Sequence, residues 1–423
     1  MRVARWILGI AGAVALLAVA AALIATQLID PDHYKGQLES AVRRETGRPF
    51  VLEGHLRLTW FPWLGVRTGP ARIGAPVGTG GPDLLGWRSA EVRVRLLPLL
   101  LHRHIELARV RIVGAAIHLR RGPRGEGNWE DLVARLEPGS GAGATPAAGK
   151  AAVSYWSAAW AGLDLEQSSL DYIDERSRQH FGLQDWNLSV GPWRPGEPLS
   201  LRTSFVLHAG TPGSSASADG GLRLPAAGVR VSLDAPQLRI STGPLAVAAP
   251  RWSLRIADAK LEGALEAGSD GAGRLAASGS VQAAVPSLRE LARTLGIAMP
   301  RTADPAALGA LSLSGSWSCR DGGLEVRPLA ARLDSTAITG WVTWSRPPSP
   351  IAAAGASPPG PAWKFALRAD QVDIGRYVTQ SKTRQPLELP VRALQALSAQ
   401  GTLELEHARL GDTTLNDVRL EVQ

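Results

Sequence analysis

Two histidines and a glutamate alternate along one segment, at positions that could bind a metal ion. His102, His104 and Glu106 would share one face of a strand, and imidazole and carboxylate groups are suitable zinc ligands. Arg103 and Arg109 add positive charge to the same segment, and no neighbouring side chain is placed to orient the two imidazoles. We therefore expect a solvated strand end here and no metal cofactor.

The other reactive residue types lack the spacing that catalysis requires. Asp171, Asp174 and Glu175 could serve acid–base chemistry, but arginines follow directly, which favours a charged turn. Cys319, the single cysteine, falls in an alternating strand pattern and is expected to pack. The segment ATPAAGKA lacks the spacing of a P-loop, and no G-x-S-x-G motif occurs. We expect no enzyme activity, no catalytic residue and no cofactor.

The composition narrows the class of protein. The 423 residues are 45% hydrophobic and 20% charged, which excludes an acidic disordered chain. One cysteine excludes a disulfide-stapled module, and 46 glycines with 30 prolines disfavour an all-helical protein. The net charge is +8, yet the arginines are dispersed and no nucleic-acid-binding motif occurs, so we expect no nucleic acid partner.

The N-terminus contains a predicted membrane anchor. No charged residue lies between Trp6 and Ile29, and a helix over this stretch would be about 36 Å long, enough to cross a bilayer core. Arg2 and Arg5 precede it and Asp30 follows, so the positive-inside rule places the N-terminus in the cytoplasm and the rest outside. A cleaved signal peptide is the alternative, since small residues crowd the end of the stretch.

After the anchor the hydrophobic period changes from that of a helix to that of strands. An amphipathic helix is predicted from Pro31 to Thr46, capped by Asp30 and ended by Gly47. Apolar and polar residues then alternate in many segments, as in antiparallel strands with one apolar face. These segments lie near residues 52–60, 90–96, 110–119, 199–207, 229–233, 252–256, 311–317, 363–367, 403–405 and 418–422.

The predicted fold is mainly β: a transmembrane helix, then an elongated, curled antiparallel sheet whose apolar face forms a groove, with a few short helices. Those helices are expected at 156–163, 287–295 and 391–399. Small and proline-rich residues mark linkers at 137–152 and 346–362. The resulting divisions are 1–29 (tip and anchor), 30–136, 153–345 (middle β region) and 363–423. Trp60, Trp63 and Trp87 either pack in the core or lie at a membrane-facing end.

The segment after the anchor resembles the start of the AsmA family, in which D-P-x-x-Y-K, an amphipathic helix, T-G-R and F-P-W-L-G follow one another. The matching positions here are Asp30, Pro31, Tyr34, Lys35, Thr46, Gly47, Arg48, Phe61, Pro62, Trp63, Leu64 and Gly65. Similarity continues at 89–100, 105–121 and 125–132, and resumes at 300–315, 369–378 and 401–420. The middle of the chain is less similar.

The resemblance implies an inner-membrane protein with a periplasmic β-rich body that supports outer-membrane biogenesis, similar to bridge-like lipid-transfer proteins. The expected ligand is a membrane lipid, a phospholipid above all, held in the groove. The residues expected to line it are Leu56, Leu58, Val92, Val94, Phe205 and Leu207. Two alternatives are an envelope factor that assists outer-membrane protein assembly through strand edges, and a membrane-anchored hydrolase, which the missing nucleophile motif disfavours.

The C-terminal segment predicts an unpaired strand edge. Val418, Leu420 and Val422 still alternate as the sequence ends at Gln423. AsmA-like chains typically continue with further strands here, so the chain resembles a member truncated at this end. We expect this edge to pair with a partner chain or with a separately encoded remainder. A natural short member whose last strand frays is the alternative.

Overall fold

The structure is a computed structural model, and it describes residues 32, 35–59, 63–76, 81–95, 107–132, 161–194, 196–209, 224–225, 227–241, 246–269, 274–297, 299–320, 322–345, 363–377, 399–411 and 413–422. The predicted anchor, both predicted linkers, the His102–Glu106 segment, Asp30 and Trp60 lie outside these residues. Among the described residues, no helix is both long and apolar enough to span a bilayer.

The chain divides into two compact units near residue 221, with residues 200–202 assigned to the second unit. The first unit opens with α2 (Lys35–Thr46), which confirms most of the predicted helix. The helix ends at Gly47, whose positive φ of 70° lets its N–H reach the carbonyl of Arg43. The divisions predicted at the two linkers stay a prediction.

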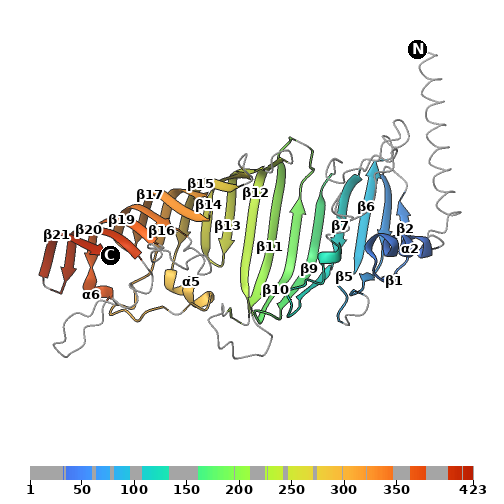
Figure 1. The fold of residues 1–423 in the computed structure, drawn as a ribbon, viewed down its shortest axis with the longest axis horizontal. Helices are drawn as coiled ribbons and strands as arrows, with labels where there is room; N and C mark the ends of the chain where they lie inside the picture. The colour runs from blue at the N-terminus through green and yellow to red at the C-terminus, as the bar shows by residue number, and fades with distance from the viewer. Residues whose placement is uncertain are drawn as a thin grey trace, which may run out of the picture. The chain divides into compact units, whose positions relative to one another are not determined.

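The strands of the first unit come mostly as consecutive halves of longer, kinked strands (Figure 1). The halves are β1 (Phe50–Leu52) with β2 (Leu56–Thr59), β3 (Trp63–Thr68) with β4 (Ala71–Ile73), β5 (Leu85–Trp87) with β6 (Ser89–Arg95), and β7 (Leu107–Val113) with β8 (Ala116–Arg121). Uninterrupted strands follow: β9 (Leu163–Asp174), β10 (Gln179–Val190) and β11 (Leu199–Ala209).

The kinks share one line across the sheet, and glycines lie at three of them. At the first two kinks Gly54 and Gly69 face each other so closely that a Cβ on Gly54 would lie 2.4 Å from the Gly69 Cα. The next kink has Gly114 with φ of 67° against the Arg88 side chain. β9 continues the line with Gln167 at φ of 49°. Each kink is a bulge-like break that bends the strand while its halves keep pairing.

Pairing in the first unit is antiparallel with one exception. The rows run β2–β3–β6–β7 on one side of the kink line and β1–β4–β5–β8 on the other, and both meet β9, which pairs with β10. β9 lies parallel to both β7 and β8. The prediction of a wholly antiparallel sheet was therefore wrong, because the connection at 122–162 is long enough for a crossover that returns the chain in the same direction.

The second unit is a strand meander. Its strands are β12 (Val229–Ser241), β13 (Ala246–Ile256), β14 (Ala259–Ser269), β15 (Leu275–Val285), β16 (Leu311–Arg320), β17 (Gly323–Leu333), β18 (Thr336–Trp344), β19 (Trp363–Asp373), β20 (Ala399–Leu410) and β21 (Thr413–Val422). Neighbours in sequence pair antiparallel, except that β19 and β20 are parallel. The helices are α5 (Leu288–Thr294) and α6 (Ile374–Tyr377).

The short helix predicted at 287–295 is confirmed as α5, with Ser287 as its N-cap accepting from the Glu290 N–H. The helix predicted at 391–399 lies outside the described residues except for Ala399, which begins β20. Of the helix predicted at 156–163, only 161–163 are described; they are not helical, and Leu163 begins β9.

Buried apolar residues pack into two small clusters, and others, such as Leu165 and Val229, lie outside them. In the first unit Phe50, Leu52, Leu56 and Ala71 pack with Val42 of α2, so the helix covers the sheet on one side of the kink line. In the second unit Ala369, Leu405 and Ala408 pack with Ile374 of α6 and with apolar neighbours on four strands. The rest of each sheet has no comparable cover among the described residues.

Candidate functional site

An unbroken row of apolar residues crosses all ten strands of the second unit. Each member lies directly opposite the next in the strand register, so the row runs perpendicular to the strands. We call it the long apolar row; it consists of Leu233, Leu254, Leu261, Ala283, Leu313, Ala331, Ile338, Ala369, Leu405 and Val418. At about 4.8 Å between strands it extends roughly 43 Å.

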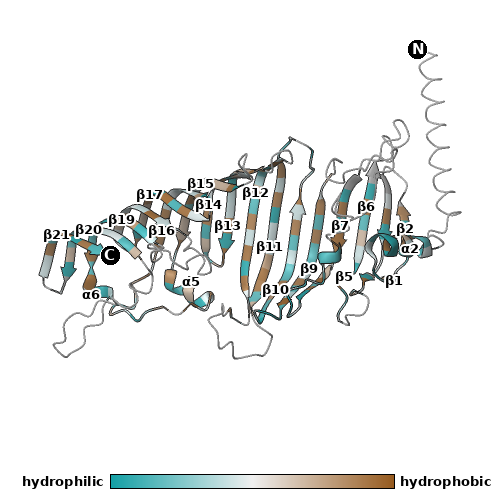
Figure 2. Cartoon of the chain, in the orientation of Figure 1, coloured by the Kyte–Doolittle hydropathy of each residue, from teal (hydrophilic) through white to brown (hydrophobic). Residues whose placement is uncertain are grey.

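Most of this row is open to solvent or to a ligand. Only Ala369 and Leu405, which lie at α6, are buried, and the other members are half-buried. The alternating residues point to the opposite face and are polar or small, as β16 shows with Ser312, Ser314 and Ser316. Figure 2 shows the resulting alternation of hydrophobic and hydrophilic colour along the strands. One face of this sheet thus carries a continuous row of apolar side chains, most of them half-buried among the described residues.

The first unit repeats the arrangement with a shorter row. Register places Leu58, Val66, Val92, Val110, Leu163 and Val190 in line across β2, β3, β6, β7, β9 and β10. We call this the short apolar row. Val66 and Val92 are each 36% exposed, although they stand in the middle of the sheet. The other four members are half-buried.

The structure separates the residues that sequence analysis grouped. Leu58 and Val92 lie in the short apolar row, whereas Leu56 is buried in the cluster under α2. Val94 is in β6 opposite Leu64, and its side chain lies outside the described residues. Phe205 and Leu207 alternate in β11 and are half-buried. None of these placements tests ligand binding, so their role stays a prediction.

Alanines in the long apolar row escaped the sequence analysis. Ala283 belongs to β15, which is rich in Ala, Ser and Gly, so that its hydrophobic alternation is weak. The signal that could have indicated this strand is the alternation of Ala and Val with Ser and Gln in LAASGSVQAAV.

The opposite face of the first unit carries ion pairs. Directly opposite one another across β2, β3, β6, β7 and β9 lie Arg57, Arg67, Glu91, Arg111 and Asp164. Glu91, 10% exposed in its side chain, accepts from Arg93 at 2.6 Å and from Arg67 at 2.8 Å. The hydrogen bond from Arg93 lowers the pKa of Glu91, burial opposes it, and Arg67 adds to the lowering.

Asp164 on β9 is stabilised as a carboxylate in the same way as Glu91. The hydrogen bond from Arg109 lowers its pKa, burial works against that, and Ser189 adds a further hydrogen bond. Side chains of this face line a hollow of about 330 Å³. These carboxylates are therefore ionised at neutral pH and bind arginine rather than acting as acids or bases.

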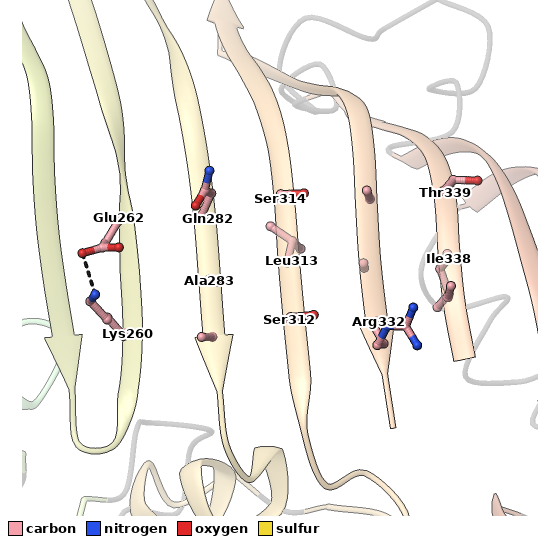
Figure 3. A pocket seen from close by; sticks show the side chains of 14 residues that line it. Lys260, Glu262, Gln282, Ala283, Ser312, Leu313, Ser314, Arg332, Ile338 and Thr339 are labelled. Atoms are coloured by element: carbon pink, nitrogen blue, oxygen red, sulfur yellow. Dashed lines mark ion pairs between the residues drawn. The ribbon is translucent and has the colours of Figure 1, made fainter. Parts of the chain in front are cut away.

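A larger hollow, of about 640 Å³, lies along β14–β18 of the second unit (Figure 3). Most of its lining residues alternate with the long apolar row, so it belongs mainly to the polar face; they include Lys260, Glu262, Gln282, Ser312, Ser314, Arg332 and Thr339. Lys260 and Glu262 form an ion pair at 2.7 Å within it. Four members of the long apolar row, Ala283, Leu313, Ala331 and Ile338, also line this hollow.

The remaining predicted residues have structural partners. Asp174 accepts from the N–H groups of Arg176 and Ser177, and Glu175 pairs with Arg120, which confirms the charged turn for these two. Asp171 was assigned to that turn wrongly: it lies inside β9, which sequence analysis missed because its apolar residues are sparse. Cys319 lies in β16 opposite Ala277 and Leu324, consistent with packing.

Of the three tryptophans singled out, Trp87 packs against Phe50 at 5.9 Å between ring centroids and donates to Thr68. The core interpretation therefore holds for Trp87. The side chains of Trp60 and Trp63 lie outside the described residues.

Two pairs of sequence motifs meet in space. Arg48 of the T-G-R motif binds the carbonyl of Asn128 and the carboxylate of Asp131, both in the segment at 125–132. Asp304 and Arg376, from the segments at 300–315 and 369–378, pair at 2.8 Å. In both cases a loop is fastened to a distant part of the same unit. These motifs therefore stabilise the ends of the sheets.

The described residues contain no group of three or more His, Cys, Asp or Glu side chains that could hold a metal ion. His102 and His104 are not among the described residues, so this finding does not cover them.

Comparison with known proteins identifies the family of this chain. The profile of the AsmA family matches residues 1–240, more than half of the chain. No curated protein and no solved structure matches it. The matched region contains the predicted anchor, the T-G-R motif and the short apolar row. The chain therefore belongs to the AsmA family.

Proposed function

We propose that this protein is a lipid-binding or lipid-transfer scaffold, anchored in the inner membrane with its body in the periplasm, that supports outer-membrane biogenesis. The observation that carries the proposal is the long apolar row, which is continuous over ten strands and mostly half-buried among the described residues. No catalytic arrangement of side chains competes with it among the described residues, and the proposed role is not enzymatic.

The physical argument concerns acyl chains in water. Each CH2 group removed from water contributes about 0.8 kcal/mol, so a chain of 16 carbons strongly favours an apolar surface. Along a continuous row an acyl chain could move from strand to strand without meeting a polar barrier, because successive strands present equivalent apolar side chains. The polar opposite face keeps the same strands soluble. Membrane lipids, phospholipids above all, fit this chemistry.

The experiment is lipid analysis of the purified protein. The full chain is extracted in detergent, exchanged extensively into a second detergent, and its bound lipids are identified by mass spectrometry. A fixed stoichiometry of phospholipid that survives exchange supports the proposal, and fluorescent lipid transfer between liposomes measures movement. Lipid-free protein that instead captures unfolded outer-membrane β-barrels through its strand edges would favour an assembly factor.

A further inference from the structure

Arginines outnumber carboxylates on the polar face of β2, β3 and β6 in the first unit. These three strands together contain four arginines and a single acidic residue, Glu91. Arg57, Arg67 and Glu91 lie directly opposite one another in the strand register, and Arg93 follows Glu91 by two positions on the same face. We call Arg57, Arg67, Glu91 and Arg93 the arginine face. It carries three positive charges and one negative charge.

Two of these arginines place like charges directly opposite each other in neighbouring strands. Arg57 of β2 is the register partner of Arg67 of β3, and like charges in that relation repel. Glu91 does not neutralise both, because its two oxygens accept from Arg67 at 2.8 Å and from Arg93 at 2.6 Å. Arg57 is exposed and forms no ion pair among the described residues. An anion bound from outside would remove the repulsion.

The hydrogen-bonding groups of the arginine face suit a phosphate ester. Toward Glu91, Arg67 donates through Nη2 and Arg93 through Nε, which leaves further N–H groups on both guanidinium groups. The side chains of Arg67 and Arg93 are 54% and 47% exposed, so a ligand can reach them. A planar guanidinium binds phosphate through two parallel hydrogen bonds, and these charge-assisted bonds are stronger than neutral ones.

The start of β2 lies close to the end of the predicted membrane anchor. Oδ1 of Asp32 accepts from the Leu56 N–H at 2.9 Å, and Leu56 directly precedes Arg57. Ile29, the last uncharged residue of the predicted anchor, precedes Asp32 by three positions, so these two residues lie at most about 11 Å apart. The phosphate esters nearest to the arginine face are therefore the headgroups of the membrane that the anchor crosses.

We propose that the arginine face binds the headgroups of anionic phospholipids in the membrane surface around the anchor. The membrane location rests on the proposed function, whereas the charge arrangement does not. Leu58, Val66 and Val92 of the short apolar row alternate with these arginines and lie on the opposite face of the same strands. Headgroup binding is therefore separate from the binding of acyl chains, and it would orient the first unit on the membrane.

The test compares two lipids on the full chain in a neutral detergent. Dihexanoyl phosphatidylglycerol and dihexanoyl phosphatidylcholine have the same acyl chains, so the ratio of their affinities reports the headgroup. One arginine beside an anionic lipid contributes about fivefold, and we expect the wild type to prefer phosphatidylglycerol by at least about that factor. Arg57→Gln should reduce the preference, and Arg57→Gln with Arg67→Gln should abolish it. High salt should weaken it, because these charges are exposed.

The matched control is Arg202→Gln with Arg419→Gln, which removes two exposed arginines from other strands and should keep the preference. Equal affinity of the wild type for both lipids, or a preference that survives in the folded Arg57→Gln, Arg67→Gln variant, would overturn the proposal. Inorganic phosphate that binds as tightly as phosphatidylglycerol would assign the site to a soluble anion and overturn it as well. A failure of the proposed lipid function would appear differently, as an unchanged affinity of Leu313→Asp for phosphatidylcholine. Circular dichroism checks the fold of each variant.

Discussion

Arg48 and Asp131 join two segments that are 83 residues apart in the sequence, and the arginine is 1% exposed in its side chain. Arg48 Nε donates to Oδ2 of Asp131 at 3.3 Å, while Nη1 donates to the Gly74 carbonyl. A buried guanidinium needs all these acceptors, because an unpaired charge in the interior is costly. The pair therefore fixes the segment at 125–132 against the end of α2 and the strand β4.

Removing the carboxylate should destabilise the first unit. Asp131→Ala leaves a buried charge without its ionic partner, and we expect a loss of about 1.5–3 kcal/mol in the free energy of unfolding. Urea denaturation followed by tryptophan fluorescence measures it. Glu197→Ala is the matched control, since its ion pair with Arg194 is 59% exposed on both sides and should contribute little. Equal losses in the two variants would contradict the structural role of Arg48.

Acid should destabilise the first unit as Glu91 and Asp164 become protonated. Glu91 and Asp164 have pKa values lowered, chiefly by hydrogen bonds from Arg93 and Arg109, with burial opposing the shift. For a lowered pKa the stabilisation is complete above the ordinary values of 4.5 and 3.8 and is lost as pH falls below them. Urea midpoints at pH 7, 5, 4 and 3 should fall mainly below pH 4.5. Glu91→Gln should flatten that fall, and an unchanged profile would sink the assignment.

Two neighbouring substitutions should separate the faces of the second unit. Leu313→Asp puts a carboxylate in the long apolar row, whereas Ser314→Asp puts it on the exposed polar face of the same strand. If lipid occupies the row, Leu313→Asp should lower the affinity for lipid roughly tenfold, because a carboxylate placed against acyl chains costs at least about 1.4 kcal/mol. Ser314→Asp should keep it. Equal lipid content in the two folded variants would argue against the row as the binding surface.

Two glycines should respond in opposite directions to alanine. Gly54→Ala forces a Cβ to within 2.4 Å of the Gly69 backbone, so we expect a loss of about 1–3 kcal/mol at the kink line. Gly36→Ala lies in α2 with open space around it and should stabilise by about 0.5 kcal/mol. Thermal melts of both variants decide the point. A neutral Gly54→Ala would mean that the strands can separate at the kink without cost.

Much of the strand pattern could be predicted because alternation is a local property. Leu311, Leu313 and Trp317 alternate with serines, and β16 forms there. Ser287 and Gly47 marked helix ends that the structure confirms. In contrast, the sequence analysis did not predict β9, β10, β14, β15, β17 or β18. In β15 the reason is that Ala, Ser and Gly give little hydrophobic contrast along a strand.

The sequence by itself determined which residues of a strand share a face, because successive side chains point in opposite directions. It did not determine which strands pair. The parallel pairing of β9 and β20 with their neighbours, and the alignment of residues into the two apolar rows, were therefore decided only by the tertiary structure. Whether an apolar residue is covered was also decided there. Leu56 and Leu58 follow the same pattern, yet Leu56 packs beneath α2 and Leu58 lies in the open row. Covering depends on contacts with segments distant in sequence, which local periodicity does not encode.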